Sequence, residues 1–132
     1  MSIPLLCIAL LALLCLLLGF NVSLARGKAI VACGGEPDPT SPLYKAQRAH
    51  GNTIEYAPIL AILFYVLGQS QPADWVNWTM ILVTACRYLL VLGLLLPATM
   101  AKPNPMRFVG ALGTYIGGLV LSVVLLLNAL NI

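Results

Sequence analysis

Three polar residues, Arg48, Asn52 and Glu55, follow one another at the spacing i, i+4, i+7. Because successive residues of a helix are rotated by about 100°, these three side chains lie on one helical face. Ile59 is the next residue on that face, so the polar stripe ends there. A cation, an amide and a carboxylate on one face can bind a small charged molecule, and the pattern predicts a site for such a ligand.

Glu55 lies near the middle of its predicted helix, about 12 residues or roughly 18 Å from either end. A charge near the centre of a membrane costs at least ~2.5–3.5 kcal/mol, so it is expected to face other helices and to have a partner. Arg87 lies at a similar depth on the next helix, and we predict that it pairs with Glu55. The pair alone could serve only to fix helix packing. It does not account for Arg48 and Asn52, because packing alone favours small residues, and a ligand site is therefore preferred.

The composition places this stripe in a membrane protein. Hydrophobic residues make up 61% of the 132 residues, charged residues make up 8%, and the mean hydropathy is +0.97. A soluble domain is about half apolar and a quarter charged, and so small a globule could not bury this much apolar surface. These values exclude a soluble enzyme, a disordered chain and a nucleic-acid-binding protein. The net charge of +3 is therefore interpreted as a topology signal.

Four segments are long and apolar enough to cross a membrane, which takes about 20 residues. They are residues 3–25, 43–67, 73–96 and 106–130. Backbone groups in lipid are satisfied only in helices or closed barrels, and segments of this length are helices. We therefore predict one all-α domain over residues 1–132, an integral membrane four-helix bundle with antiparallel neighbours and a long connection over residues 26–42.

Basic residues are divided unequally between the two ends of the predicted bundle. The second connection and both termini have none, whereas the first and third connections are flanked by Arg26, Lys28, Lys45, Arg48, Lys102 and Arg107. Positive charge remains on the cytoplasmic side of a membrane. The first and third connections are therefore expected to be cytoplasmic, and both termini are expected to lie on the opposite side.

The first apolar segment has two interpretations. Residues 23–25, Ser-Leu-Ala, could form the cleavage region of a signal peptide. However, no basic residue precedes the segment, and it is long for the apolar part of a signal peptide. A retained membrane helix is favoured, and cleavage remains the alternative.

The usual catalytic and metal-binding motifs are missing from the sequence. It contains no Ser-His-Asp set, zinc motif or phosphate-binding loop. The four cysteines form neither a CxxC pair nor the clustered framework of a small disulfide-rich domain. No metal site is therefore expected.

The second predicted helix carries a longer motif around the stripe. The pattern Arg-Ala-x-x-Asn-x-x-Glu-Tyr-x-Pro resembles the second-helix signature of the MAPEG family, the membrane-associated proteins in eicosanoid and glutathione metabolism, which include microsomal glutathione transferases. The match falls on Arg48, Ala49, Asn52, Glu55, Tyr56 and Pro58. Four spans in a chain of this length also fit, so the resemblance covers nearly the whole sequence.

This resemblance implies a homotrimer of four-helix bundles, with glutathione bound between neighbouring subunits near the cytoplasmic side. By motif position, the residues that bind glutathione are Arg26, Arg48, Asn52, Glu55, Tyr56 and Arg87. Two residues are implied to be catalytic: Arg107, which resembles an arginine that stabilises the thiolate, and Tyr88, which belongs to an Arg-Tyr pair on the third helix. Leu92 stands near the place where some catalytic members carry a second tyrosine.

Glutathione suits these residues because arginines bind its carboxylates bidentately and Glu55 can accept from its ammonium group. The resemblance thus implies glutathione as co-substrate and no metal. The expected partners are two further copies of the chain, the lipid bilayer and a hydrophobic small molecule. No nucleic acid is expected. The leading hypothesis is a glutathione-binding membrane protein that conjugates glutathione to lipophilic electrophiles or reduces peroxides. Two alternatives stay open: a non-catalytic membrane scaffold or lipid-binding four-helix bundle, and a transporter subunit that uses Glu55 as a proton or cation site.

Overall fold

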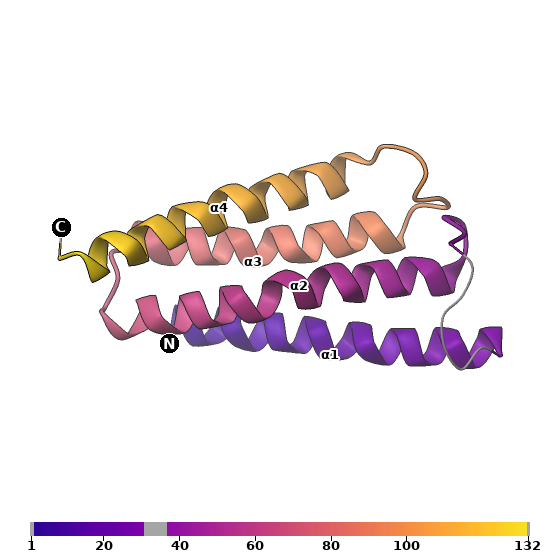
Figure 1. Ribbon diagram of the computed structural model, residues 1–132, viewed down its shortest axis with the longest axis horizontal. Helices are drawn as coiled ribbons and strands as arrows, with labels where there is room; N and C mark the ends of the chain where they lie inside the picture. Colours follow the sequence, from indigo (N-terminus) through magenta and orange to yellow (C-terminus); the bar gives the residue numbers. More distant parts are fainter. Residues whose placement is uncertain (1, 31–36, 132) are drawn as a thin grey trace.

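The protein consists of four long helices, with no strand in the part of the chain that the structure describes, residues 2–30 and 37–131 (Figure 1). The computed structural model has α1 at Ile3–Ala29, α2 at Pro42–Gln69, α3 at Asp74–Leu95 and α4 at Pro105–Ala129. Each helix is long and apolar enough to cross a membrane. The prediction of an all-α, integral membrane four-helix bundle is confirmed, and the protein is a multi-pass membrane protein.

Proline and a capping side chain define the first turn of α2. Pro42 occupies the first helical position, where a backbone N–H would have no partner within the helix. The Ser41 hydroxyl oxygen accepts from the Tyr44 N–H at 3.5 Å and so satisfies one of the free donors of that turn. Asn104 and Pro105 repeat this arrangement at the start of α4. The chain thus begins both helices at fixed residues, and the candidate site residues Arg107 and Arg48 follow in the first turn of α4 and the second turn of α2.

Successive helices run antiparallel, and both termini lie at the same end of the bundle (Figure 1). The most extensive contacts join α1 to α2 and α3 to α4, while α3 also contacts both α1 and α2. Contacts between α2 and α4 are few, and the described parts of the α1 and α4 backbones do not approach each other closely. The arrangement is therefore two hairpins, α1–α2 and α3–α4, joined mainly through α3. Of the helix pairs in contact, α2 and α4 share the smallest contact.

The core consists of two apolar clusters along the bundle. One contains Leu11, Leu60, Phe64, Met80 and Leu121, and the other contains Leu14, Leu18, Ala49, Leu90 and Leu94 among their buried members. Many other large apolar side chains are exposed, for example Leu16, Ile59, Trp78 and Leu119. Such exposure would be unfavourable in water, and it is what helices facing acyl chains require.

Close backbone packing joins α4 to α3. A Cβ atom added at Gly110 would lie 2.6 Å from the backbone nitrogen of Leu90 and 2.7 Å from the carbonyl oxygen of Cys86. Only a glycine fits at this distance, as is common where membrane helices approach closely. This contact fixes the beginning of α4, and therefore the position of Arg107, against the end of α3.

Candidate functional site

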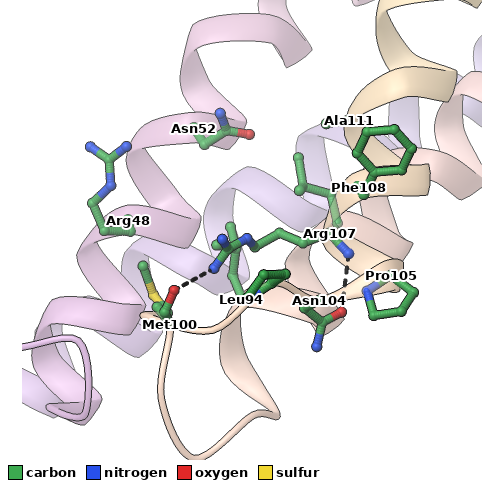
Figure 2. A pocket seen from close by; sticks show the side chains of 11 residues that line it. Arg48, Asn52, Leu94, Met100, Asn104, Pro105, Arg107, Phe108 and Ala111 are labelled. Carbon is green, nitrogen blue, oxygen red and sulfur yellow. Dashed lines mark hydrogen bonds between the residues drawn. The ribbon is translucent and has the colours of Figure 1, made fainter.

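A pocket lies at the end of the bundle where α2 and α4 begin (Figure 2). Its volume is about 890 Å³, and its walls come from α2, the second half of α3, the α3–α4 connection and the first two turns of α4. The apolar part of the lining consists of Leu90, Leu94, Met100, Pro103, Pro105, Phe108 and Ala111. The polar part consists of Arg48, Asn52, Asn104 and Arg107. The only charged side chains in this lining are the two arginines, so the pocket is suited to an anion with an apolar portion.

Three of the predicted site residues meet in this pocket. Arg48 and Asn52 stand on α2, one turn apart, and Arg107 extends from α4 toward them (Figure 2). The guanidinium group of Arg107 is held in place because its Nη1 donates to the carbonyl oxygen of Met100 at 2.9 Å. Figure 2 shows this bond at the base of the pocket, between the two helices.

The N-cap of α4 positions the backbone of Arg107. Asn104 Oδ1 accepts from the N–H of Met106 at 2.8 Å and from the N–H of Arg107 at 3.2 Å. Gly93 on α3 lies against the same turn, since a Cβ atom there would be 2.6 Å from the Arg107 nitrogen. Asn104 and Gly93 therefore fix the backbone of Arg107, and the Met100 carbonyl group fixes its side chain.

Arg87 holds Asn52 from behind the pocket. Its Nη2 donates at 2.9 Å to both the backbone carbonyl and the side-chain Oδ1 of Asn52, and at 3.5 Å to the Thr53 hydroxyl. Arg87 is only 1% exposed, and it does not line the pocket. Because Oδ1 is occupied by Arg87, the amide group of Asn52 is oriented with its Nδ2 donor left for a ligand.

The predicted ion pair between Glu55 and Arg87 is wrong in this arrangement. Among the described residues, Arg87 makes its hydrogen bonds with Asn52 and Thr53, and the side chain of Glu55 is exposed. The prediction matched Glu55 and Arg87 by depth alone, whereas three residues of helix rotate the side-chain direction by about 300°. When Asn52 faces α3, Glu55 points about 60° to one side of it, out of the bundle.

Tyr56 continues the polar cluster away from the pocket. The guanidinium carbon of Arg87 lies 5.2 Å from the centre of the Tyr56 ring, a distance typical of a cation–π contact. The Tyr56 hydroxyl is 3.4 Å from that of Tyr115 on α4, and the ring centres are 5.6 Å apart. Tyr56 is thus placed next to Arg87, as part of the support of the site rather than of the pocket lining.

A profile of the MAPEG family matches residues 4–127. The chain belongs to the MAPEG family. Comparison with curated proteins and with solved structures gave no match. Family membership makes this a membrane protein of eicosanoid and glutathione metabolism, and the predicted membership is confirmed.

Besides Glu55, Tyr56 and Arg87, two further residues implied by the MAPEG resemblance lie outside the pocket lining. Tyr88 donates its hydroxyl to the carbonyl oxygen of Leu10 on α1 at 2.9 Å, and so ties α3 to α1. Arg26 lies near the end of α1, and its Nε is buried without a hydrogen-bond partner in the described structure. Neither side chain lines the pocket, so the structure brings together Arg48, Asn52 and Arg107 but not Arg26 or Tyr88.

Two residues that line the pocket of this MAPEG protein, and Lys45 beside it, are not among the predicted site residues. Met100 supplies the carbonyl group that binds Arg107, Phe108 forms part of the apolar wall, and Lys45 binds the end of α3. Lys45 could have been found from helical spacing, since it lies three residues before Arg48 and so on the same face of the helix, whereas Phe108 directly follows Arg107 and spacing does not group the two. Met100 lies in a connection without periodicity, and nothing in its residue type indicates its role.

No metal-binding group was found in residues 2–30 and 37–131, where no three His, Cys, Asp or Glu side chains cluster. The pocket instead offers guanidinium and amide donors. Donors of this kind bind carboxylates and stabilise a thiolate, and they do not coordinate a cation.

Proposed function

We propose that this MAPEG protein binds glutathione in the pocket between α2 and α4. Glutathione carries two carboxylates, and arginine binds a carboxylate with paired, charge-assisted hydrogen bonds. Arg48 is exposed at the mouth of the pocket, where it can receive one carboxylate. The free Nδ2 donor of Asn52 lies one turn away for a second polar group of the peptide.

Arg107 stabilises the glutathione thiolate in this proposal. A thiolate is the nucleophile of conjugation and of peroxide reduction, and a nearby cation lowers the thiol pKa from its usual value of about 8.5. A guanidinium group has five N–H donors, so the bond to Met100 leaves others for sulfur or carboxylate. Deprotonation at neutral pH is thereby favoured without a separate base.

The second substrate is a lipophilic electrophile or peroxide that enters from the bilayer. Phe108, one residue after Arg107, is 68% exposed and belongs to the apolar wall of the pocket. A substrate dissolved among acyl chains can contact this wall while its reactive group approaches the thiolate. Conjugation then forms a bond from sulfur to the electrophilic carbon while the bond to the leaving group breaks, and the leaving group departs as an anion with that electron pair.

The observation that carries the proposal is the junction of Arg48, Asn52 and Arg107 from two helices that otherwise have few contacts. The buried Arg87 adds support, because it holds Asn52 through two hydrogen bonds of 2.9 Å. A bundle that only packed would not need a buried arginine to orient an amide group at the edge of a cationic pocket.

We also propose that the site is completed in a homotrimer, as the family resemblance implies. Glu55 is exposed although it lies in the middle of α2, at a depth where an uncovered carboxylate is costly. In a trimer, a neighbouring copy can cover Glu55. The Arg26 of that copy can also reach the pocket, whereas the Arg26 of the same chain does not line it. Native mass spectrometry of the protein from mild detergent is expected to give the mass of three chains, and a monomer would contradict this part.

The orientation in the membrane stays a prediction from the basic residues. With the first and third connections cytoplasmic, the pocket faces the cytoplasm and takes its glutathione from that side of the membrane. Cysteine introduced at exposed Thr40 is expected to react with a membrane-impermeant maleimide only after cells are opened. Reaction in intact cells would reverse the orientation.

Titration of the purified protein with glutathione tests the proposal. In lipid nanodiscs, binding is expected at millimolar glutathione or below, and Arg48→Ala is expected to weaken it at least several-fold because a charge-assisted pair is lost. Lys102→Ala is the matched control: it removes an exposed cation from the same end of the protein, outside the pocket lining. Equal loss in both variants, or no binding to the wild type, would refute the site.

Turnover is measured alongside binding with 1-chloro-2,4-dinitrobenzene. Arg107→Met is expected to lower the rate more than the affinity, since it removes the stabilisation of the thiolate. Binding without turnover would contradict the proposed conjugation and leave glutathione a ligand of this site that is not a substrate.

A further inference from the structure

Lys45 connects the first turn of α2 to the end of α3. Its Nζ donates to the carbonyl oxygen of Pro97 at 2.9 Å and to that of Leu95 at 3.4 Å. The last carbonyl groups of a helix have no partner within it, and a cation there also interacts favourably with the helix dipole. Lys45 therefore fixes the point at which the chain leaves α3.

Met100 fixes the same connection at a second point. Its N–H donates to the carbonyl oxygen of Pro39 at 2.9 Å, and its own carbonyl oxygen accepts from Arg107 Nη1 at 2.9 Å. Both backbone groups of Met100 are thus used to link the segment before α2 to the guanidinium group on α4. The connection from Leu96 to Asn104 is held from the α2 side and in turn holds Arg107.

This link sets the width of the pocket. α2 and α4 have few direct contacts, so the distance from Arg48 to Arg107 depends on α3 and on the connection that follows it. Lys45 lies one turn before Arg48 on α2, and it binds that connection directly. It does not line the pocket itself.

We propose that Lys45 is a positioning residue for Arg107. By holding the α3–α4 connection to α2, it places the Met100 carbonyl so that the Arg107 guanidinium faces Arg48 and Asn52. The identity of the ligand rests on the proposed function, but the positioning of Arg107 does not. Lys45 acts on the thiol of bound glutathione only through Arg107.

The test measures the pKa of the bound glutathione thiol from its ultraviolet thiolate absorbance as a function of pH. Lys45→Met is expected to raise that pKa toward the value of free glutathione, because the cation beside the sulfur is no longer held in place. Lys45→Arg retains donors for the α3 carbonyls and is expected to restore a lowered pKa. Lys102→Met, on the exposed part of the same connection, is the control and is expected to leave the pKa unchanged.

A double-mutant cycle separates positioning from general destabilisation. In an Arg107→Met background, Lys45→Met is expected to change the thiol pKa no further, since the residue through which it acts is already gone. An equal change with and without Arg107 would overturn the proposal, and so would a wild-type pKa in Lys45→Met. Should Lys45→Met not fold, Lys45→Ala, which removes the Nζ donor without placing a long apolar side chain against the α3 carbonyls, takes its place in the same cycle.

Hydrogen exchange gives a reading that needs no glutathione. Lys45→Met is expected to speed amide exchange at Met100 and in residues 96–104 at least several-fold, while the second half of α2 exchanges as in the wild type. If the wild type bound no glutathione but this change occurred, the proposed function would fail and the positioning of Arg107 would stand. Unchanged exchange at Met100 would overturn the positioning itself.

Discussion

The two halves of α2 bury different kinds of side chain. From Pro42 to Ala57 the helix buries mainly small residues, among them Ala46, Ala49, Thr53 and Ala57. From Pro58 to Gln69 it buries the large apolar residues Leu60, Leu63, Phe64 and Leu67. The second half contributes to the apolar core, whereas the first half lets neighbouring side chains reach its backbone.

This difference explains how a polar stripe is accommodated within a membrane helix. Small buried residues at Ala49 and Thr53 allow Arg87 to reach the Asn52 carbonyl from α3. A large side chain at either position would fill the space that the guanidinium group occupies. The second half has no such requirement, and ordinary packing of leucine and phenylalanine stabilises it. In the proposed site the first half of α2 therefore serves the ligand, and the second half serves stability.

The largest expected effect on stability lies in the apolar half. Phe64 is fully buried, and Phe64→Ala is expected to lower the free energy of unfolding by ~3–5 kcal/mol through lost contacts and a cavity. Glutathione affinity of the protein that remains folded is expected to be unchanged. Thermal unfolding in nanodiscs, followed by glutathione titration below the transition, measures both. A several-fold loss of affinity would show that the two halves are not separable.

Arg87→Met tests the polar half, where the expected loss of glutathione affinity is large and the expected loss of stability is small. The variant leaves the Asn52 oxygen unpaired, which costs about 1–3 kcal/mol, less than Phe64→Ala. The Asn52 amide is then free to turn, so glutathione binding is expected to weaken several-fold or more. The decisive quantity is the ratio of lost affinity to lost stability. Wild-type affinity in a destabilised Arg87→Met would mean that Arg87 serves packing alone.

A pair of glycines on α2 gives a finer comparison. A Cβ atom at Gly68 would lie 2.9 Å from the Cβ and Cγ atoms of Pro4, so Gly68→Ala is expected to destabilise by about 1–3 kcal/mol. At Gly51 nothing lies within 4 Å, and Gly51→Ala is expected to stabilise by roughly 0.5–1 kcal/mol because alanine favours a helix. Chemical unfolding in detergent compares the two. Destabilisation by Gly51→Ala would indicate that another chain contacts this site.

The smallest expected effect concerns the turn before α2. The N–H and the hydroxyl of Thr40 donate to the Asp38 carboxylate and lower its pKa below the usual 3.8. A lowered native pKa means that the carboxylate contributes stability above about pH 3.8 and loses it as the pH falls below that value. The unfolding temperatures of wild type and Asp38→Ala are therefore expected to differ slightly at pH 6, and the difference is expected to shrink as the pH falls below 3.8. A difference that grew in acid would contradict this sign.

The sequence predicted the helices because their signal is long and strong. Hydropathy placed all four spans, and the proline after Ser41 or Asn104 placed two helix starts within one residue. The end of α1 lies at Ala29 rather than Ala25, because the polar residues after Ala25 continue the helix for one more turn beyond its apolar part. Hydropathy reports where the apolar stretch ends, and a helix can extend past it.

The candidate site was predicted only as far as one helix determines it. Spacing on α2 correctly grouped Arg48 with Asn52, since both belong to the same face. The partner of Arg87 depends on how α2 and α3 are rotated against each other, and depth alone led to Glu55 instead of Asn52. The Met100 carbonyl depends on the path of an irregular connection, which has no period to read.

A crystal structure grown from a lipid mesophase with glutathione present tests the central claim most directly. The account predicts a glutathione carboxylate within hydrogen-bond distance of Arg48, a polar group of the peptide at Asn52 Nδ2, and the sulfur beside the guanidinium group of Arg107. Glutathione bound elsewhere, or Arg48 and Asn52 packed against acyl chains with the pocket closed, would contradict it.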